Sequence, residues 1–310
     1  MIEAVNLTKR YGKKTAVDNI SFTVEPGTVT GFLGPNGAGK STTMRMIMGL
    51  DKPTSGKVTI NGRPYRQLSA PLCEVGALLD AKGLHGSRSA RSHLRQLAAS
   101  NGIPAKRVDE VLDITGLTSV AKKRVKGFSL GMGQRLGIAA ALLGDPGVLL
   151  FDEPVNGLDP EGVKWVRETC RRLAGEGRTV FISSHLMSEM AQTADHLLVI
   201  GRGRILTSGP VDEVIASVTS DRVRVASPQA TQLAELMASR NLAAQPVAPN
   251  VLETTATTAA TIGELAAQGG IVLHELTTIH ASLEEAYMTL TSDSVEYRAD
   301  PTSQNQVQQA

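Results

Sequence analysis

One glycine-rich segment near the N-terminus has residue types and a spacing that suit the binding of phosphate groups. It fits the pattern G-x-x-x-x-G-K-[ST] and lies between a strand predicted over Val29–Leu33 and a helix predicted over Ser41–Leu50. Its members are Gly34, Pro35, Asn36, Gly37, Ala38, Gly39, Lys40 and Ser41. Glycines let backbone N–H groups face an anion that a Cβ would obstruct, and the following helix adds the positive end of its dipole.

The side chains at the end of this loop are those that a bound nucleotide and a metal ion require. Lys40 can neutralise the oxygens of the β- and γ-phosphates, and the Ser41 hydroxyl can ligate Mg²⁺. Thr42 adds a hydroxyl that we expect near the α-phosphate. The loop therefore predicts a nucleotide site, but a phosphate loop alone does not separate kinases, GTPases and motor ATPases.

Two adjacent carboxylates narrow this choice. Asp152 and Glu153 follow the apolar run Val148–Phe151, which is typical of a buried strand. Two acids at the end of such a strand are costly unless cations or protons offset their charge. Asp152 suits a contact with Mg²⁺ through water, and Glu153 suits the orientation or deprotonation of an attacking water. The alternative, a solvated acid pair in a loop, is disfavoured by the apolar run.

Further motifs occur in a fixed order along the first two thirds of the chain. They are Tyr11, Gly34–Ser41, Ser129–Gln134, Asp152-Glu153, Asn156–Asp159 and His185. Together they resemble the nucleotide-binding subunit of an ABC transporter over residues 1 to about 210, and several motifs at compatible spacing are more specific than any one. The resemblance implies an α/β fold of the P-loop NTPase, ABC ATPase type. Its parts are a mainly parallel core sheet, an antiparallel β subdomain and a helical signature subdomain.

The resemblance also implies ATP and Mg²⁺ as cofactors and assigns roles to single residues. Tyr11 matches the aromatic side chain that stacks on adenine, and His185 matches the switch histidine that senses the γ-phosphate and supports the water. Ser129 and Gly131 match signature residues that contact the γ-phosphate held by the opposing subunit. Asp159 matches the aspartate that communicates across the dimer. Taken alone, Tyr11 would be an ordinary strand-edge tyrosine and His185 a structural histidine.

The sequence departs from the family pattern at two places. In the signature, where the family has L-S-G-G-Q, the first glycine is replaced by Leu130 and the glutamine by Met132. The segment Val75–Asp80, which we expect to be a loop, has no glutamine, and Asp80 is its nearest counterpart for binding Mg²⁺ or contacting the membrane partner. This pair of variations is similar to the branch of bacitracin- and lantibiotic-type export and immunity transporters.

Charge divides the chain near Pro210. The chain carries a net charge of +2, yet residues 1–210 hold 28 basic and 18 acidic side chains, whereas residues 211–310 hold 4 and 12. We therefore predict an ATPase domain over residues 1–210, an accessory α+β domain over 211–291 and a disordered tail over 292–310. The predicted elements of the accessory domain follow the order of a split βαβ, ferredoxin-like unit. They are Arg222–Ala226, Ala230–Arg240, Val251–Thr255, Thr258–Gln268, Ile271–Leu276 and Ser282–Leu290.

Composition limits the classes of function. No apolar run approaches the ~20 residues that a membrane span needs, and two cysteines make no disulfide framework. Basic residues are scattered and only 3% of residues are aromatic, so no nucleic-acid partner is expected.

We expect an ATP-hydrolysing subunit, a homodimer on the cytoplasmic face of the plasma membrane. It would power a separately encoded permease that exports a drug or antibiotic-like compound. One alternative is a soluble ABC ATPase that acts on ribosomes or DNA. Such relatives usually carry two cassettes or long insertions, and this chain has neither. A second alternative, a non-hydrolysing adaptor, is disfavoured by Asp152, Glu153 and His185.

Overall fold

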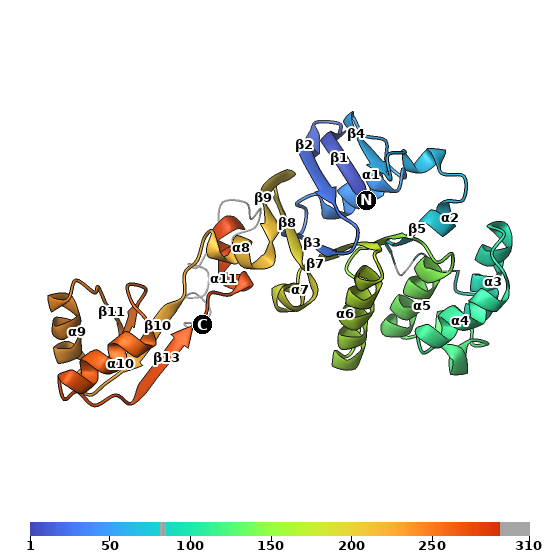
Figure 1. The fold of residues 1–310 in the computed structure, drawn as a ribbon. Helices are drawn as coiled ribbons and strands as arrows, with labels where there is room; N and C mark the ends of the chain where they lie inside the picture. Colours follow the sequence, from blue (N-terminus) through green and yellow to red (C-terminus); the bar gives the residue numbers. More distant parts are fainter. Residues whose placement is uncertain (81–82, 84, 292–310) are drawn as a thin grey trace, which may run out of the picture. The chain divides into compact units, whose positions relative to one another are not determined.

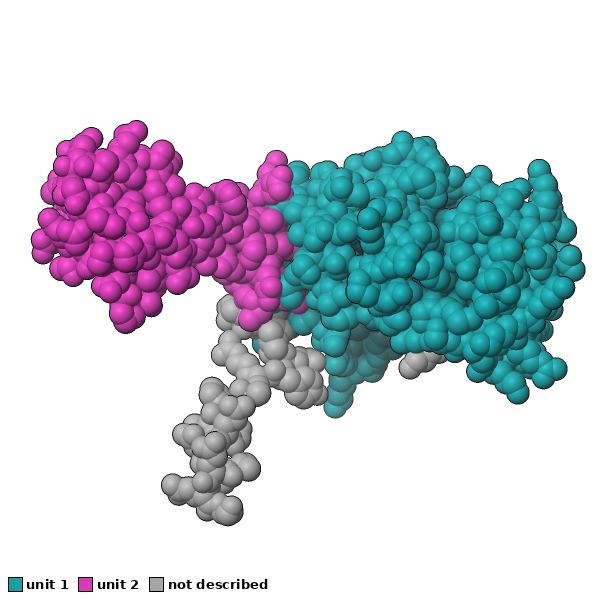
Figure 2. Space-filling model, turned by 90° about the horizontal axis from the view of Figure 1, so that it is seen from below, with its two compact units in different colours: residues 1–211, 291–310 teal, residues 212–290 magenta. Residues whose placement is uncertain are grey.

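The computed structural model describes residues 1–80, 83 and 85–291. These residues form two compact units, residues 1–211 and residues 212–290, which Figure 2 colours separately. The tail predicted to be disordered, residues 292–310, lies outside the described residues. No helix of the described part is long and apolar enough to cross a bilayer.

A six-stranded sheet forms the centre of the first unit. Its strands lie in the order β5 (Val75–Leu78), β6 (Val148–Phe151), β7 (Thr179–Ser184), β3 (Val29–Leu33), β8 (His196–Gly201) and β9 (Arg204–Pro210). All neighbouring pairs are parallel except β8 and β9. Every residue of β6 and β7 is buried, as apolar strands covered on both faces require. The mainly parallel core sheet is therefore confirmed, and the carboxyl ends of its strands meet at one edge.

A second sheet is antiparallel and has the order β2 (Lys14–Val24), β1 (Ile2–Tyr11) and β4 (Ser55–Ile60). Strands β1 and β2 are long because their pairing continues to a two-residue turn. Phe22 of β2 packs against Phe181 and Phe32 of the central sheet, with ring centroids 5.9 and 6.3 Å away. One apolar core thus joins the two sheets.

Helices complete this unit (Figure 1). They are α1 (Lys40–Ile47), α2 (Pro71–Glu74), α3 (Ala90–Ser100), α4 (Lys106–Ile114), α5 (Leu130–Leu142), α6 (Pro160–Gly175) and α7 (Met187–Thr193). Helix α5 lies very close to β5, since a Cβ on Gly76 would be 2.0 Å from the carbonyl oxygen of Ala141. This contact ties the helical part, where the signature motif lies, to the edge of the central sheet.

One prediction for this unit was wrong, and one of its strands was not predicted. Val75–Leu78, expected to be part of a loop, is strand β5, which is short and pairs only with β6. Its glycine and alanine give a weak strand pattern, but Gly76 permits the close approach of α5. The antiparallel strand β9 was not predicted, because none of its residues is buried and its second half, Thr207–Pro210, has no apolar residue that would indicate a strand.

The second unit begins in α8 (Val211–Ala216) and contains a four-stranded antiparallel sheet and three further helices. The elements are β10 (Arg222–Ala226), α9 (Ala230–Ser239), β11 (Gln245–Ala248), β12 (Val251–Thr254), α10 (Ala259–Gln268), β13 (Glu275–Ile279) and α11 (Leu283–Thr291). The strand order is β11-β12-β10-β13. The second strand of each βαβ half, β11 or β13, therefore lies at an edge of the sheet, and the first strands, β10 and β12, lie in the middle. This connectivity is the ferredoxin-like one. Val223, Leu233 and Ile262 lie in its core.

The last strand of this unit was misplaced by the sequence analysis. We expected it over Ile271–Leu276, but β13 covers Glu275–Ile279. Ile271 is buried against the α-helical layer, in the cluster that also contains Leu233 and Ile262, and its N–H donates to Ala266 at the end of α10. The apolar character of this segment therefore reflects helix packing and not strand pairing. Strand β11 was also missed, since all four of its residues are exposed.

The contact between β5 and α5 predicts a measurable cost of a single methyl group. Gly76→Ala should lower the free energy of unfolding by about 1–3 kcal/mol, because the new Cβ would overlap a main-chain carbonyl that cannot move freely. Gly175→Ala is the control, since nothing lies within 4 Å of a Cβ at that position. Equilibrium denaturation should show Gly175→Ala unchanged or stabilised. Equal stability of both variants would contradict the described packing.

Candidate functional site

The loop between β3 and α1 adopts a tight turn that only glycine allows at two points. Gly34 lies against β8, where a Cβ would be 2.4 Å from the carbonyl oxygen of Ile200. Gly39 has φ of 112° and caps α1, and a Cβ there would be 2.6 Å from the carbonyl oxygen of Ala16. These contacts fix the loop from two sides. The N-terminal end of α1 consequently opens onto the loop, as an anion site requires.

A cavity of about 200 Å³ lies at this helix end. Its lining residues are Pro35, Asn36, Gly37, Gly39, Lys40, Ser41, Thr42 and Glu153. Lys40 is buried, and its Nζ donates to the carbonyl oxygen of Gly34 at 2.6 Å. Burial lowers the pKa of Lys40, while the nearby carboxylates of Glu153 and Asp152 act in the opposite direction. Most of the predicted phosphate-loop residues thus line one cavity with one buried cation.

The two acids predicted from the sequence leave β6 at the same edge of the sheet. The N–H of Asp152 donates to the carbonyl oxygen of Leu78 at 2.7 Å, which continues the pairing of β5 and β6. The hydroxyl of Ser183, at the end of β7, donates to the carboxylate of Asp152. The same hydroxyl oxygen accepts the N–H of Glu153 at 3.0 Å. Ser183 is fully buried, so it fixes both acids to the neighbouring strand.

Glu153 has a left-handed backbone with φ of 51°. Such a conformation costs a non-glycine residue about 1–3 kcal/mol and persists only where its surroundings hold it. The Nε2 of Gln134 donates to the Glu153 carbonyl oxygen at 2.9 Å. His185 meets the carboxylate twice, with its Nδ1 at 2.7 Å and its N–H at 3.3 Å from Oε2. The carboxylate is therefore aimed into the cavity and carries a histidine partner.

Two of these residues were not selected from the sequence. Ser183 directly precedes Ser184-His185, and a serine at the end of a buried strand next to two acids is the signal that could have identified it. Gln134 lies within the quoted signature segment, but nothing in the sequence shows that it faces Glu153. Both contacts depend on pairing between elements that are distant in the chain.

Tyr11 does not line the cavity. The residue is 47% exposed, and its hydroxyl donates to Asp51 at 2.9 Å. Asp51 also accepts from Arg45 of α1 at 2.8 Å, and Lys9 Nζ lies 4.8 Å from the centroid of the Tyr11 ring. Burial, then the bond to Asp51, raises the pKa of the Tyr11 hydroxyl. Through Asp51, the Tyr11 ring is thus connected to the helix that follows the phosphate loop. A large part of this residue's surface is accessible to the base of a nucleotide.

The remaining predicted contacts lie away from the cavity of their own chain. Ser129 caps α5 and accepts the N–H of Met132, and Asp159 caps α6 and accepts the N–H of Gly162 at 2.9 Å. Gly131 packs on the loop before α6, since a Cβ there would be 3.1 Å from the carbonyl oxygen of Gly157. Neither cap nor Gly131 lines the phosphate cavity. In this chain they form a second, separate group at the starts of two helices.

The two departures from the family pattern have clear positions. Leu130 lies over Gly157, where a Cβ would be 2.2 Å from its side chain, so the substitution fills the space above that glycine. Asp80 is exposed and follows β5, two residues beyond the carbonyl that pairs with Asp152. Among the described residues, no group of three His, Cys, Asp or Glu side chains could hold a metal alone.

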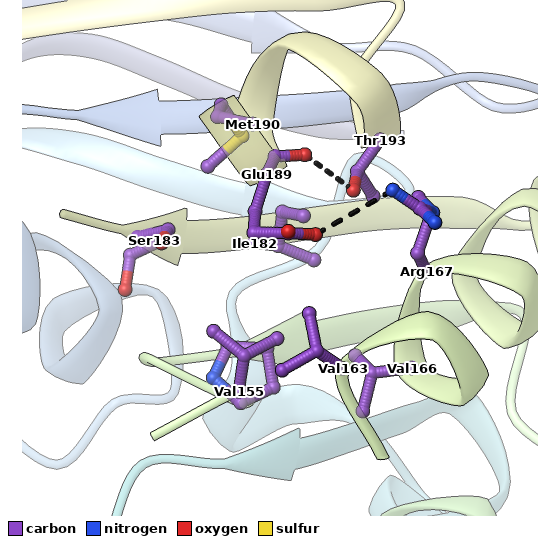
Figure 3. Close-up of a pocket in the computed structure, with 11 residues that line it drawn as sticks. Val155, Val163, Val166, Arg167, Ile182, Ser183, Glu189, Met190 and Thr193 are labelled. Atoms are coloured by element: carbon purple, nitrogen blue, oxygen red, sulfur yellow. Dashed lines mark hydrogen bonds and ion pairs between the residues drawn. The ribbon is translucent and has the colours of Figure 1, made fainter. Parts of the chain in front are cut away.

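A separate, small cavity of about 20 Å³ lies between α6, β7 and α7 (Figure 3). Val163 and Val166 of α6 line one side and Met190 of α7 lines the other, while Arg167 pairs with Glu189 at 3.6 Å. Its lining is largely aliphatic and shares no residue with the phosphate cavity. The two cavities are therefore separate.

Comparison with known proteins identifies the family. Residues 17–156 match the family model described as ABC transporter. The chain is 45% identical over 217 residues to the bacitracin transport ATP-binding protein BcrA of Bacillus licheniformis, covering 69% of this chain and 71% of that protein. The chain belongs to the ABC transporter family. It is an ABC ATPase that binds and hydrolyses ATP.

Other matches extend over more of the chain. The uncharacterized ABC transporter ATP-binding protein YhcH of Bacillus subtilis is 35% identical over 300 residues, covering 96% of this ABC ATPase and 97% of YhcH. A solved ATP-binding subunit of an ABC transporter has a TM-score of 0.64 at 26% identity, covering 70% of this chain and 92% of that chain. Residues 221–284 match a family described as a domain of unknown function. The ABC ATPase fold is therefore confirmed.

The cap of α6 gives a prediction about the structural role of Asp159. Asp159→Ala should lower the free energy of unfolding by about 1 kcal/mol, because the N–H of Gly162 loses its acceptor. Asp159→Ser keeps a capping oxygen and should retain nearly all stability. Thermal unfolding of both variants checks this. A serine variant as unstable as the alanine variant would show that the cap is not what Asp159 contributes.

Proposed function

We propose that this chain is the ATP-hydrolysing subunit of a transporter that powers a separately encoded integral membrane permease. One observation carries the proposal. The Glu153 carboxylate lines the phosphate cavity, and His185 contacts it there at 2.7 Å. A carboxylate beside a phosphate loop, paired with a histidine, can accept a proton from water that attacks a γ-phosphate. The site thus has the groups for hydrolysis as well as for binding.

In the proposed complex the loop residues 34–39 hold the phosphates of ATP through backbone N–H groups. Lys40 turns its ammonium from the Gly34 carbonyl toward the β- and γ-phosphates, and Thr42 contacts the α-phosphate. Ser41 and Asp152 are the residues that would hold Mg²⁺, which supplies positive charge to the γ-phosphate and leaving oxygen. Ser183 keeps Asp152 oriented toward that position. Tyr11 stacks on adenine through its accessible face.

His185 has two functions in this proposal. Its main-chain N–H and its ring both bind Glu153 Oε2, so the other carboxylate oxygen stays available to the water. When Glu153 accepts the proton, the His185 ring can stabilise the protonated carboxyl group and contact the γ-phosphate with its second nitrogen. Such a pair orients the base before ATP arrives, which lowers the cost of reaching the reactive geometry.

A homodimer completes the proposed site. Ser129 and Gly131 lie outside the cavity of their own chain, and so does Asp159, although the start of α5 presents the Ser129 hydroxyl and an anion-binding helix end. Two copies facing head to tail would bring Ser129 of each to the γ-phosphate held by the other. Two ATP molecules would then be bound between the subunits, and hydrolysis would allow the two subunits to separate.

The membrane partner and the cargo are inferred from relatives. BcrA is named a bacitracin transport ATP-binding protein. We therefore propose export of a drug or antibiotic-like compound and a peripheral position at the cytoplasmic face of the plasma membrane. The permease would dock near Asp80 and helices α3 and α4. Affinity purification should recover an integral membrane protein with many spans, and recovery of ribosomes in its place would contradict the proposal.

Replacing the carboxylate of Glu153 tests the catalytic role. Glu153→Gln should keep ATP affinity but lose turnover by roughly 100-fold or more, since an amide cannot accept the proton. It should also accumulate an ATP-bound dimer, visible by light scattering after gel filtration. Glu161→Gln, an exposed acid of the first turn of α6, is the matched control and should hydrolyse ATP normally. Hydrolysis by Glu153→Gln at the wild-type rate would refute the assignment.

Asp80 is tested by separating hydrolysis from transport. Asp80→Ala should bind ATP normally, because this exposed side chain does not line the phosphate cavity. It should uncouple the two activities, so that transport per ATP hydrolysed in membrane vesicles falls. Asp80→Asn, which keeps the size, indicates whether the charge is required. Normal ATPase together with normal transport in Asp80→Ala would leave this residue without the proposed role.

A further inference from the structure

Gln134 is an unusual residue for the interior of this helix. It is 4% exposed, and the other buried residues of α5, such as Leu136 and Ile138, are apolar or glycine. A buried amide is retained only where its polar atoms are satisfied. Its Nε2 donates to the main-chain carbonyl oxygen of Glu153 at 2.9 Å, and only the nitrogen end of the amide can make this bond. The side chain thus connects α5 to the residue that faces the phosphate cavity.

The backbone of Glu153 is held on both sides. Its N–H donates to Ser183 Oγ at 3.0 Å, and its C=O accepts from Gln134. These two bonds flank the φ of 51° and determine where the Glu153 side chain leaves the main chain. Without one of them, the strained residue could relax toward a more common conformation. The carboxylate would then turn away from His185 and the cavity.

The same helix carries the signature at its start. Ser129 caps α5 five residues before Gln134, and Gly131 packs on Gly157 of the loop that follows Glu153. The first turns of α5 therefore contact the catalytic segment at two points. These two contacts link the start of α5 to Glu153 and the loop after it in the same chain.

We propose that Gln134 is a positioning residue for the base: it holds the left-handed backbone of Glu153, so that signature helix α5 supports the catalytic carboxylate of its own subunit. This inference rests on the proposed function, because it assigns Glu153 as the base. When Ser129 binds the γ-phosphate in the partner's site, the orientation of α5 also sets the aim of Glu153 in its own site. ATP bound in one site thereby affects the orientation of Glu153 in the other site.

Gln134→Met tests this proposal, because methionine keeps the length of the side chain and removes the N–H donor. The expected result is a 10- to 100-fold loss in kcat, which is the roughly 100-fold scale of a 1 Å misplacement, with an unchanged KM for ATP. In the Glu153→Gln background, the same substitution should cause no further loss of the residual single-turnover rate. An equal fold-loss in both backgrounds, or a normal kcat in Gln134→Met, would overturn the proposal.

A neighbouring residue controls for general damage to α5. Arg135 lies next in the helix but contacts the carbonyl oxygen of Thr115 and the Trp165 ring, not Glu153. Arg135→Met should keep the wild-type kcat per folded molecule even where it lowers the melting temperature. Should Gln134→Met fail to fold, Gln134→Asn takes its place, since it stays polar but is too short to reach the Glu153 carbonyl.

The outcomes separate this inference from the proposed function. Wild-type protein that does not hydrolyse ATP, or full activity of Glu153→Gln, would refute the proposed function itself. An active wild type, an inactive Glu153→Gln and a normal Gln134→Met would refute only the role of Gln134. Loss of kcat in Gln134→Met without loss in Arg135→Met, and with no further loss in the Glu153→Gln background, supports both.

Discussion

The balance of charge around Lys40 is the constraint on which the site depends. A buried ammonium is unfavourable, and burial lowers its pKa, yet Glu153 and Asp152 lie close enough to act in the opposite direction. The protein holds this cation at the carbonyl of Gly34, at the end of the strand that precedes α1. A triphosphate adds more negative charge than one lysine can offset, which is why the proposed mechanism requires Mg²⁺ and the signature helix of a second copy.

Much of this site could be predicted from the sequence because its motifs are local. The residue types of the glycine loop that ends in Lys40 are enough to indicate phosphate binding. Those of the apolar strand that precedes Asp152 are enough to indicate a carboxylate at the end of a buried strand. The hydrogen bonds that orient the site are not local, because Ser183 and Gln134 reach Glu153 from elements 30 and 19 residues away. The left-handed φ of Glu153 was likewise invisible, since it follows from those bonds and not from a residue that favours it.

The fold, too, could be predicted where the sequence signal is local and could not where it is not. Strand β6 was predicted with its observed bounds, because burial on both faces leaves a continuous apolar run. Three strands at sheet edges were not predicted, since β9 and β11 expose much of their surface and the glycine and alanine of β5 give a weak strand pattern. In the ferredoxin-like unit, Ile271 packs on a helix, which displaced the prediction of β13. Edge strands are fixed by tertiary pairing that one sequence segment does not encode.

The central claim is that each ATP is bound by the phosphate loop of one copy and the signature of another. It is tested most directly by mixing Lys40→Met with Ser129→Asp, which keeps a helix cap but repels phosphate. Each variant alone should be inactive. The mixture should recover up to about a quarter of the wild-type turnover, because half of the dimers would be mixed and each would contain one intact site. A mixture as inactive as its components would show that both residues act within one chain, and would contradict this account.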